Sequence, residues 1–288
     1  MKVALLPNLT REDALLVTRK LIETFDKLGA SYCIALEDKN LLKAPLAQFM
    51  PRAGLFEHCD VIIAIGGDGT IIHAAKQAVP YGKPVLGVNA GRLAFMAGLE
   101  GNETGLVVNL LNGNYNVDRR MLLQAEVFDD GKCVCSNLCV NDAVFSRAGQ
   151  MKLVELFVDC GGKRINDYSG DGIIVATPTG STAYSLSAGG PVIDPCVEGI
   201  LLTPVCTHAL FARPLFFSPD SVLTVTPAAG GNVSLYCDAD DGMPLPETGR
   251  VVVTKAKQTA DFIRVKSDMF FDILNSKLIR GSDTPAID

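Results

Sequence analysis

The chain has 288 residues, with 26 Lys and Arg against 32 Asp and Glu and a formal net charge of −6. This length favours two domains, with one large α/β unit as the alternative. The acidic balance and the lack of a Lys/Arg cluster argue against a nucleic-acid-binding surface, which needs clustered cations.

The N-terminal residues differ from a targeting segment. From Met1 to Asn8 there is one lysine and then a short apolar run, which suits a first strand better than a signal peptide. No apolar run reaches the roughly 18–20 residues that a membrane-spanning helix needs. We therefore expect a cytoplasmic protein with neither a membrane nor a nucleic-acid partner.

Residues 1–118 alternate short apolar runs with helical patterns, which is typical of βαβ units and a parallel sheet. Thr10 is the predicted cap of an amphipathic helix that ends at Gly29. A second helix is predicted from about Thr70 to Val79. The strands are predicted at residues 2–7, 31–36, 60–65 and 84–88, the third of them apolar enough to be buried on both faces.

A glycine-rich loop, Gly66-Gly67-Asp68-Gly69-Thr70, joins the third strand to the second helix. Glycines let backbone N–H groups approach an anion, and a helix start adds unpaired N–H groups and a positive dipole end. A carboxylate beside a phosphate is repulsive unless it takes a proton from an attacking hydroxyl or helps to organise a divalent cation. We therefore expect the phosphate-handling centre of a nucleotide-dependent kinase. The alternative is a tight turn with Asp68 as the helix N-cap.

His73 would lie in the first turn of this helix. A basic group there opposes the helix dipole unless an anion is bound nearby, which favours a role beside a phosphate. The alternative is an exposed histidine with no role.

After residue 118 the pattern changes to short runs with period-two alternation, which predicts a β-rich second domain over residues 119–266. Residues 267–288 contain a last helical pattern, 269–279, which we expect to pack back onto another part of the molecule. The predicted fold is thus an α/β N-terminal domain with a parallel sheet, a β-rich, sandwich-like domain and a terminal helix. The runs of the second domain lie at 122–128, 153–158, 222–226 and 251–254.

The nine cysteines have no repeated spacing, so they do not predict a disulfide framework. Cys133, Cys135 and Cys139 come nearest to a metal site, but no second pair follows at zinc-finger spacing. We expect free thiols and no metal ligands from the protein.

The segment from Asp171 to Pro191 carries the most information. An apolar strand at 172–176 leads into seven hydroxyl side chains between Thr177 and Ser187. Serine and threonine are mediocre helix formers, so helix propensity does not explain this density. A surface that binds sugar hydroxyls, with Tyr184 stacking on a ring, would explain it. The alternative is a Ser/Thr-rich surface loop.

Two other polar groups follow strand-like runs. Asn141-Asp142 suits a ribose diol, but such dipeptides are usually turn residues. Asp238, Asp240 and Asp241 lack the register of a calcium-binding loop, and we expect an acidic hairpin turn there.

The glycine-aspartate loop, the segment from Asn89 to Phe95, Asn141-Asp142 and the run from Asp171 to Pro191 occur in this order. Over about residues 60–245 the chain resembles the ATP-NAD kinases. Diacylglycerol kinases, sphingosine kinases and phosphofructokinases share a similar loop, whereas TPTGSTAYSLSAGGP, from Thr177, is specific. The resemblance implies transfer of the ATP γ-phosphate to the 2′-hydroxyl of the adenosine ribose of NAD. It also implies Mg²⁺ or another divalent cation with ATP and no tightly bound cofactor.

The same resemblance implies residue roles. Asp68 would accept the proton of the 2′-hydroxyl, and Gly66, Gly67, Gly69 and Thr70 would form the phosphate loop. In that family part of the NAD groove comes from a neighbouring subunit, so a homodimer or homotetramer is implied. The implied NAD-binding residues are Asp68; Gly69 and His73 near the phosphates; Phe95 beside the adenine; Asn141 and Asp142 at ribose and adenine; Lys152, where members often place a basic or imidazole group; Asp171 at the nicotinamide end; Thr179 along the ligand; and Thr182, Ala183, Tyr184, Ser185, Leu186 and Ser187 along the groove.

Three positions depart from the family pattern. Asp142 replaces the usual glutamate, Ala94 stands where glycine is usual, and Met243 replaces a common glutamine. The shorter Asp142 carboxylate and the extra methyl of Ala94 bear on nucleotide affinity and on the preference between NAD and NADH. None of the three removes the proposed proton acceptor.

Two other functions remain as alternatives. A lipid kinase of the diacylglycerol type shares the loop, but an acidic chain with a hydroxyl-rich segment is less suited to a membrane surface. A non-catalytic regulator that binds a dinucleotide is the second alternative, and the presence of Asp68 argues against it.

Overall fold

The computed structural model of the protein describes residues 1–91, 94–148, 152–208, 212–229, 231–267 and 270–275. The chain divides into two compact units. Unit 1 contains Met1–Arg119 and Ala260–Asp288, and unit 2 contains Arg120–Thr259. Within the described ranges, no helix has both the length and the apolar character needed to cross a membrane.

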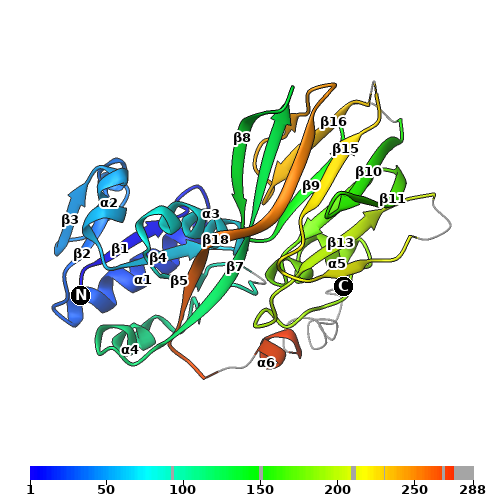
Figure 1. Ribbon diagram of the computed structural model, residues 1–288. Helices are drawn as coiled ribbons and strands as arrows, with labels where there is room; N and C mark the ends of the chain where they lie inside the picture. The colour runs from blue at the N-terminus through cyan, green and yellow to red at the C-terminus, as the bar shows by residue number, and fades with distance from the viewer. Residues whose placement is uncertain (92–93, 149–151, 209–211, 230, 268–269, 276–288) are drawn as a thin grey trace, which may run out of the picture. The chain divides into compact units, whose positions relative to one another are not determined.

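Unit 1 is built on a parallel sheet with the strand order β3-β2-β1-β4-β5 (Figure 1). β4 is buried along its whole length, as expected for a strand covered on both faces. The bounds are β1 (Val3–Pro7), β2 (Tyr32–Ala35), β3 (Ala47–Met50), β4 (Val61–Gly66) and β5 (Val85–Asn89), with the short β6 (Leu99–Glu100) paired to β5.

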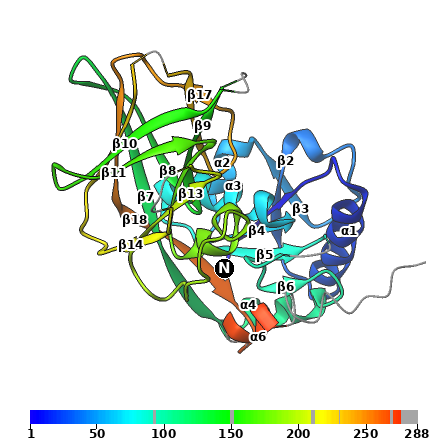
Figure 2. The same cartoon turned by 90° about the vertical axis from the view of Figure 1, so that its right-hand side faces the viewer.

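Helices cover both faces of this sheet. α1 (Glu12–Lys27) and α4 (Val107–Leu111) share one hydrophobic core with alternate residues of the strands. α2 (Arg52–His58) and α3 (Asp68–Ala78) lie on the opposite side in Figure 1, and Figure 2 shows α1 from the side. Short 3₁₀ turns occupy Leu36–Asp38, Val79–Tyr81 and Thr104–Leu106.

Unit 2 is β-rich and has one core to which two sheets contribute. One sheet has the order β14-β13-β12-β9-β16-β17, and the other contains β11-β10-β15-β18 with β7 and β8. The strands are β7 (Asn116–Asp129), β8 (Lys132–Cys139), β9 (Asp142–Arg147), β10 (Val154–Cys160), β11 (Lys163–Gly170), β12 (Gly172–Ala176), β13 (Ile200–Val205), β14 (Leu215–Phe217), β15 (Leu223–Pro227), β16 (Val233–Cys237), β17 (Met243–Pro244) and β18 (Arg250–Arg264).

The hydroxyl-rich segment follows β12 directly. It forms a 3₁₀ turn, η4 (Thr179–Thr182), and the single-turn helix α5 (Tyr184–Ser187). Ala188 and Ile193, which follow α5, pack on the outer apolar face of the sheet formed by Val144, Ile174, Ala176 and Leu201.

The last part of β18 belongs to unit 1. Its residues from Ala260 onward lie in that unit, and Phe262 pairs in parallel with Val85 of β5. The side chains of Ile263 and Val265 join the same core as α1 and α4. The C-terminal part of the chain thereby completes the sheet that begins at residue 3.

The predicted fold class is confirmed, the predicted cap of α1 was wrong, and the bounds of two other predicted elements differ from the observed ones. Thr10 does not cap α1, because its hydroxyl donates to Asn8 Oδ1 at 2.6 Å, and Arg11 occupies the N-cap position without a side-chain cap. α3 begins at Asp68, two residues earlier than predicted, because Gly67 serves as its N-cap without a side-chain signal. The run predicted at 251–254 is a small part of the long strand β18.

The terminal helix is described only as α6 (Phe270–Leu274). Residues 269 and 276–279 of the predicted helix lie outside the described residues. That this helix packs back onto another part of the molecule stays a prediction.

Candidate active site

Asp68 occupies the point where the buried strand β4 turns into α3. It is the first helical residue, so the alternative in which it serves as the N-cap is wrong. Its two oxygens accept hydrogen bonds from backbone N–H groups: Phe95 donates to Oδ2 at 2.9 Å and Met96 donates to Oδ1 at 2.8 Å. The half-buried carboxylate is therefore fixed in orientation by a segment about 27 residues further along the chain.

Glycine is needed at the three glycine positions of the loop for different reasons. A Cβ at Gly66 would overlap the side chain of Thr70, so close packing requires glycine there. A Cβ at Gly67 or Gly69 would meet nothing within 4 Å, and neither residue has a positive φ. Neither packing nor backbone conformation explains these two glycines, whereas access of an anion to their N–H groups would.

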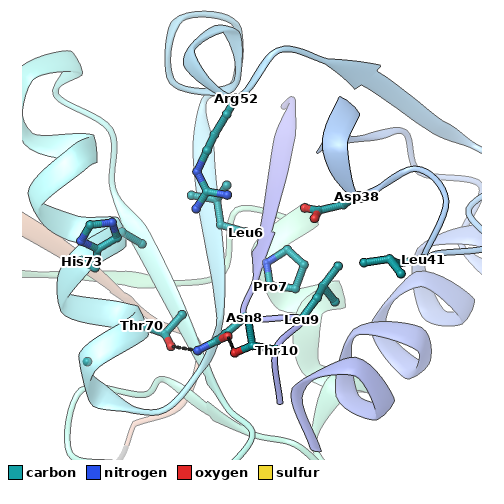
Figure 3. Close-up of a pocket in the computed structure, with 12 residues that line it drawn as sticks. Leu6, Pro7, Asn8, Leu9, Thr10, Asp38, Leu41, Arg52, Thr70 and His73 are labelled. Atoms are coloured by element: carbon teal, nitrogen blue, oxygen red, sulfur yellow. Dashed lines mark hydrogen bonds between the residues drawn. The ribbon is translucent and has the colours of Figure 1, made fainter. Parts of the chain in front are cut away.

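A cavity of about 590 Å³ lies beside this loop, entirely within unit 1 (Figure 3). Asn8, at the carboxyl end of β1, donates from Nδ2 to Thr70 Oγ1 at 3.2 Å and so links β1 to α3 beside the cavity. Arg52 brings a cationic group to the lining, and Asp38 brings a carboxyl group whose pKa is raised by burial and then by Glu37. The cavity combines hydroxyl, amide and guanidinium groups with the start of α3, a donor set suited to phosphate oxygens.

His73 lines the same cavity but lies in the second turn of α3, because the helix begins at Asp68. Its predicted place in the first turn was therefore wrong, and the argument from the helix dipole weakens accordingly. The exposed imidazole Nε2 lies 2.8 Å from Gln77 Nε2.

In unit 2, Asn141 and Asp142 stand at the start of β9, next to the first residues of the hydroxyl-rich segment. Ala176 pairs with Asp142, and the Thr177 N–H donates to the Asn141 carbonyl at 2.8 Å. The backbone of Asn141 fills the place where a Cβ of residue 180 would lie, so Gly180 is required for this approach. The structure thus brings Asn141-Asp142 together with Thr177–Gly180.

Asp238 holds these residues in place. Its carboxylate accepts three backbone N–H groups: Val140 at 2.8 Å, Asn141 at 2.6 Å and Asp142 at 3.1 Å. The predicted hairpin turn is confirmed, because β16 and β17 pair in antiparallel fashion on either side of it. The turn residue Asp238 has a left-handed φ of 55°, a conformation in which aspartate is tolerated better than most residues.

Asp142 is 5 % exposed. Burial and then the nearby Asp238 carboxylate raise the pKa of Asp142 to about 7. Asp142 is therefore poised to exchange a proton near neutral pH, unlike an exposed aspartate.

The hydroxyl-rich segment was interpreted as a surface that binds sugar hydroxyls. For the hydroxyl groups of three of its residues this interpretation was wrong. Thr177 donates to the Val140 carbonyl at 2.7 Å, Ser181 donates to the Pro178 carbonyl at 2.6 Å, and Ser185 shares a hydrogen bond with Thr203 at 2.7 Å. All three are buried, so these hydroxyls hold the turn together.

Other members of the segment reach its surface. Tyr184 is 46 % exposed, Ser187 is exposed, and Thr182, Ala183 and Leu186 are half-buried. Thr179 is buried and accepts a hydrogen bond from Arg120 Nη1 at 3.2 Å. Tyr184 and Ser187 are thus the residues whose side chains are best placed to meet a ligand.

The remaining predicted residues lie in varied surroundings. Asp171 forms an ion pair with Arg147, with Oδ1 3.6 Å from Nε, and Lys152 is exposed. Phe95 is half-buried and Ala94 is fully buried, so the extra methyl at position 94 is accommodated inside unit 1. Residues 92 and 93 of the same segment lie outside the described residues.

Two residues of the candidate site were given no role in it from the sequence. Asn8 follows β1, whose carboxyl end lies beside that of β4, and ligands of open α/β sheets bind at this edge. The position of Asn8 directly after the predicted first strand could therefore have identified it as a candidate ligand-binding residue. Asp238 has no such signal, because its partners lie 96–98 residues away in sequence.

In the part of the chain that the structure describes, no group of three or more His, Cys, Asp and Glu side chains could hold a metal ion. The nine cysteines are all free thiols. A divalent cation at the loop would therefore need ligands from a nucleotide as well as from Asp68.

Two family models match the chain: ATP-NAD kinase N-terminal domain over residues 48–115 and ATP-NAD kinase C-terminal domain over residues 140–265. A protein named NAD kinase from Symbiobacterium thermophilum is 38 % identical over 280 residues, covering 96 % of this chain and 98 % of the relative. Another NAD kinase, from Acetivibrio thermocellus, is 33 % identical and covers 96 % and 97 %.

Two solved structures share the fold. Yeast NADH kinase complexed with NADH has a TM-score of 0.84 at 22 % identity, covering 100 % of this chain and 90 % of that one. An NAD kinase from Archaeoglobus fulgidus in complex with ATP has a TM-score of 0.75 at 21 % identity, covering 96 % and 98 %. From its two domain matches and its relatives over nearly the full length, the chain belongs to the ATP-NAD kinase family.

Proposed function

We propose that this protein transfers the γ-phosphate of ATP to the 2′-hydroxyl of the adenosine ribose of NAD and so forms NADP. The placement of Asp68 supports this most directly. A fixed carboxylate stands at the start of α3, beside two glycines whose surroundings are open. The names of the relatives over nearly the whole chain support the same reaction.

Asp68 acts as the proton acceptor in this proposal. The 2′-oxygen of NAD forms a bond to the γ-phosphorus, its proton passes to the Asp68 carboxylate, and the bond from the γ-phosphorus to the bridging oxygen of ADP breaks. Each carboxylate oxygen accepts one backbone N–H in the structure. Since a carboxylate oxygen has two lone pairs, each retains capacity for the incoming hydroxyl.

The phosphate donor belongs at the loop of unit 1. The N–H groups at Gly67 and Gly69 and the start of α3 bind phosphate oxygens, and the adjoining cavity with Asn8, Arg52 and Thr70 receives part of ATP. Mg²⁺ or another divalent cation would come with ATP, whose phosphates supply oxygen ligands, because the residues that the structure describes contain no group of three or more His, Cys, Asp and Glu side chains that could hold a metal ion. Bound there, the cation would neutralise charge on the transferred group.

Many of the residues proposed to bind the acceptor NAD belong to unit 2. Asn141 and Asp142 bind ribose and adenine, Tyr184 offers an exposed ring face, and Ser187 offers an exposed hydroxyl. Other proposed contacts are Phe95, Lys152, Asp171, Thr179, Thr182, Ala183, Leu186 and His73, together with the backbone of Ser185, whose hydroxyl is buried. A homodimer or homotetramer and a cytoplasmic location complete the proposal.

The test is an assay of the purified protein with NAD, ATP and Mg²⁺, in which NADP is measured by a coupled dehydrogenase. We expect NADP formation that depends on all three components. Parallel assays replace NAD with NADH, ATP with polyphosphate, and NAD with diacylglycerol vesicles. Lipid phosphorylation without NADP would identify a lipid kinase, and NAD binding without any phosphorylation would identify a regulator.

A further inference from the structure

The segment that holds Asp68 has no regular secondary structure. Residues 94–98 form the last part of the connection between β5 and β6, and Ala94, Met96 and Gly98 are buried. Backbone groups in such a buried, irregular segment need partners outside a sheet ladder or a helix. The N–H groups of Phe95 and Met96 find theirs in the Asp68 carboxylate.

The carbonyl groups of the same segment find their partner in Arg264. Its Nη1 donates to the Ala97 carbonyl at 2.7 Å and to the Met96 carbonyl at 3.4 Å. Met96 thus contacts Asp68 through its N–H and Arg264 through its carbonyl, so one residue links the guanidinium to the carboxylate. If Met96 shifts because its hydrogen bond to Arg264 is lost, the hydrogen bond from its N–H to Asp68 is displaced as well.

Arg264 is itself fixed. It is the last residue of β18, and the pairing of Phe262 with Val85 sets the position of the strand end. Its Nε lies 3.3 Å from Asp118 Oδ2, and the two side chains are only 14 % and 20 % exposed. A planar guanidinium can donate to a carboxylate and to two carbonyls at once, which a lysine ammonium on a flexible stem cannot reproduce.

The backbone of β18 supports the segment as well. A Cβ at Gly98 would lie 2.6 Å from the Ile263 carbonyl oxygen, so segment and strand are in direct backbone contact. The Gly98 N–H donates to the Gly87 carbonyl at 2.9 Å, which anchors the end of the segment to β5. Arg264 acts on the part of the segment before Gly98, through the carbonyl groups of Met96 and Ala97.

We propose that Arg264 is a positioning residue for phosphoryl transfer, which sets the orientation of the Asp68 carboxylate through the peptide groups of residues 95–97. The proposal rests on the proposed role of Asp68 as proton acceptor. Arg264 touches neither nucleotide in it. Its loss therefore lowers turnover far more than it weakens the binding of either substrate, although Phe95 of the same segment is a proposed NAD contact.

The chain offers a matched control on the same two strands. Arg119 of β7 forms a two-bond ion pair with Asp261 of β18, at 3.0 Å and 3.2 Å. This arginine is 67 % exposed. Both of these hydrogen bonds go to Asp261. Arg119→Met removes an arginine–aspartate pair at nearly the same place in the chain without touching residues 95–97.

The kinetic test compares Arg264→Met, Arg264→Lys and Arg119→Met by thermal melting and by the NADP assay. We expect kcat to fall about 100-fold in Arg264→Met, because a displacement of about 1 Å at a reacting group has an effect of this size. The KM values for NAD and ATP should stay within about threefold, and Arg264→Lys should recover part of kcat. Wild-type turnover in folded Arg264→Met, or an equal loss in Arg119→Met, would overturn the proposal.

Amide hydrogen exchange supplies a readout that does not depend on activity. The backbone N–H groups of Phe95 and Met96 should exchange faster in Arg264→Met than in the wild type or in Arg119→Met, because their hydrogen bonds to Asp68 loosen. Unchanged exchange would overturn the proposal. If the wild-type protein makes no NADP while exchange still rises, the proposed function fails and the contact through residues 95–97 stands.

If Arg264→Met does not fold, Asp118→Asn replaces it. This change leaves Arg264 in place and weakens only its anchor. We expect a loss of kcat of about fivefold with unchanged KM, a smaller effect in the same direction. A rise of KM with unchanged kcat would contradict the positioning role.

Discussion

Each of the two units contains a carboxylate held by backbone N–H groups from a distant part of the chain. In unit 1, Asp68 accepts two N–H groups from the irregular segment after β5. In unit 2, Asp238 accepts three from the residues that lead into β9. The type of hydrogen bond is the same in both units. In unit 1 the backbone N–H groups orient the carboxylate of Asp68, whereas in unit 2 the carboxylate of Asp238 orients the backbone that donates to it.

This difference separates two kinds of effect. Asp68 is the proposed proton acceptor, so the backbone around it orients a reacting group. Asp238 fixes the backbone of Asn141 and Asp142, the proposed contacts of NAD, and takes no part in proton transfer. Changes at Asp68 should therefore act on turnover, whereas changes at Asp238 should act on the affinity for NAD.

The largest effect is expected for Asp68→Asn. An amide is a poor proton acceptor. In addition, the NH₂ group of the asparagine would replace one of the two carboxylate oxygens that now accept the N–H groups of Phe95 and Met96, so one of these hydrogen bonds would be lost. We expect kcat to fall about 1,000-fold, within the range typical of general base catalysis, with the Kd for NAD within about threefold. Steady-state kinetics and calorimetry would measure the two.

Asp60→Asn is a suitable control for that substitution. Asp60 also accepts a backbone N–H, from Lys2 at 2.7 Å, and it stands at the other end of β4. Its exposed side chain lies away from the loop, so kcat should stay at the wild-type value. Substantial turnover by Asp68→Asn would show that Asp68 is not the proton acceptor. The proposed difference in role between Asp68 and Asp238 would then be lost.

The next effect concerns the open space around the loop glycines. Gly69→Ala should lower kcat/KM for ATP about 100-fold if phosphate uses this space, while the melting temperature stays equal or rises. Alanine is a better helix former than glycine by about 1 kcal/mol, and the structure places no atom in its way. Kinetics with varied ATP and a thermal melt would measure both.

Gly66→Ala should behave in the opposite manner. Its Cβ would overlap the side chain of Thr70, and forced overpacking costs about 1–3 kcal/mol of stability. A fully active Gly69→Ala protein would show that no ligand occupies the space beside Gly69.

Much of the fold was predictable from local patterns. β4 is a continuous apolar run because it is buried on both faces, and β12 occupies the predicted residues 172–176. β3 and α2 were not predicted, because β3 is a four-residue strand at the sheet edge and α2 has only seven residues. Short elements of this kind carry too few residues for a clear hydrophobic period.

The site was predictable as residue types but not as contacts. Asp68 and its glycines form a motif, whereas the N–H groups of Phe95 and Met96 that hold Asp68 are backbone groups without a sequence signature. The hydroxyls of Ser181 and Ser185 have the same chemistry as that of Ser187, yet the first two are buried and the third is exposed. Which side chain turns inward depends on the tertiary packing after β12.

A moderate effect is expected for Asp238→Asn. The amide keeps one acceptor oxygen for the three N–H groups that now converge on the carboxylate, while the left-handed φ of residue 238 remains accessible to asparagine. We expect the KM for NAD to rise about tenfold, equivalent to about 1.4 kcal/mol, with kcat within about threefold.

Asp241→Asn changes an exposed acid of the same turn and should leave both constants unchanged. Steady-state kinetics with NAD as the varied substrate measures both variants. A fall of kcat in Asp238→Asn with unchanged KM would contradict the assignment of Asp238 as the group that holds the NAD contacts.

The last prediction concerns stability rather than kinetics, through Asp142 and the dependence of the free energy of unfolding on pH. Burial, followed by Asp238, raises the pKa of Asp142 to about 7, whereas an aspartate in the unfolded chain titrates near 4. Between these values the folded state binds more protons than the unfolded state, so the free energy of unfolding falls as the pH rises. The contribution of the protonated carboxyl group is complete below about pH 4 and is lost as the pH rises through about 7.

Asp142→Asn removes this titration, because its uncharged amide stands in for the protonated carboxyl group. At pH 8 the variant should be more stable than the wild type by on the order of 2 kcal/mol, and the difference should shrink toward pH 5. Urea denaturation at the two pH values would measure it, with Asp241→Asn as the exposed control. An equal difference at both pH values would mean that Asp142 does not carry the proton. The Asp142 carboxylate would then stay ionised beside Asp238. In this respect it would resemble Asp68, whose carboxylate must be ionised to accept a proton.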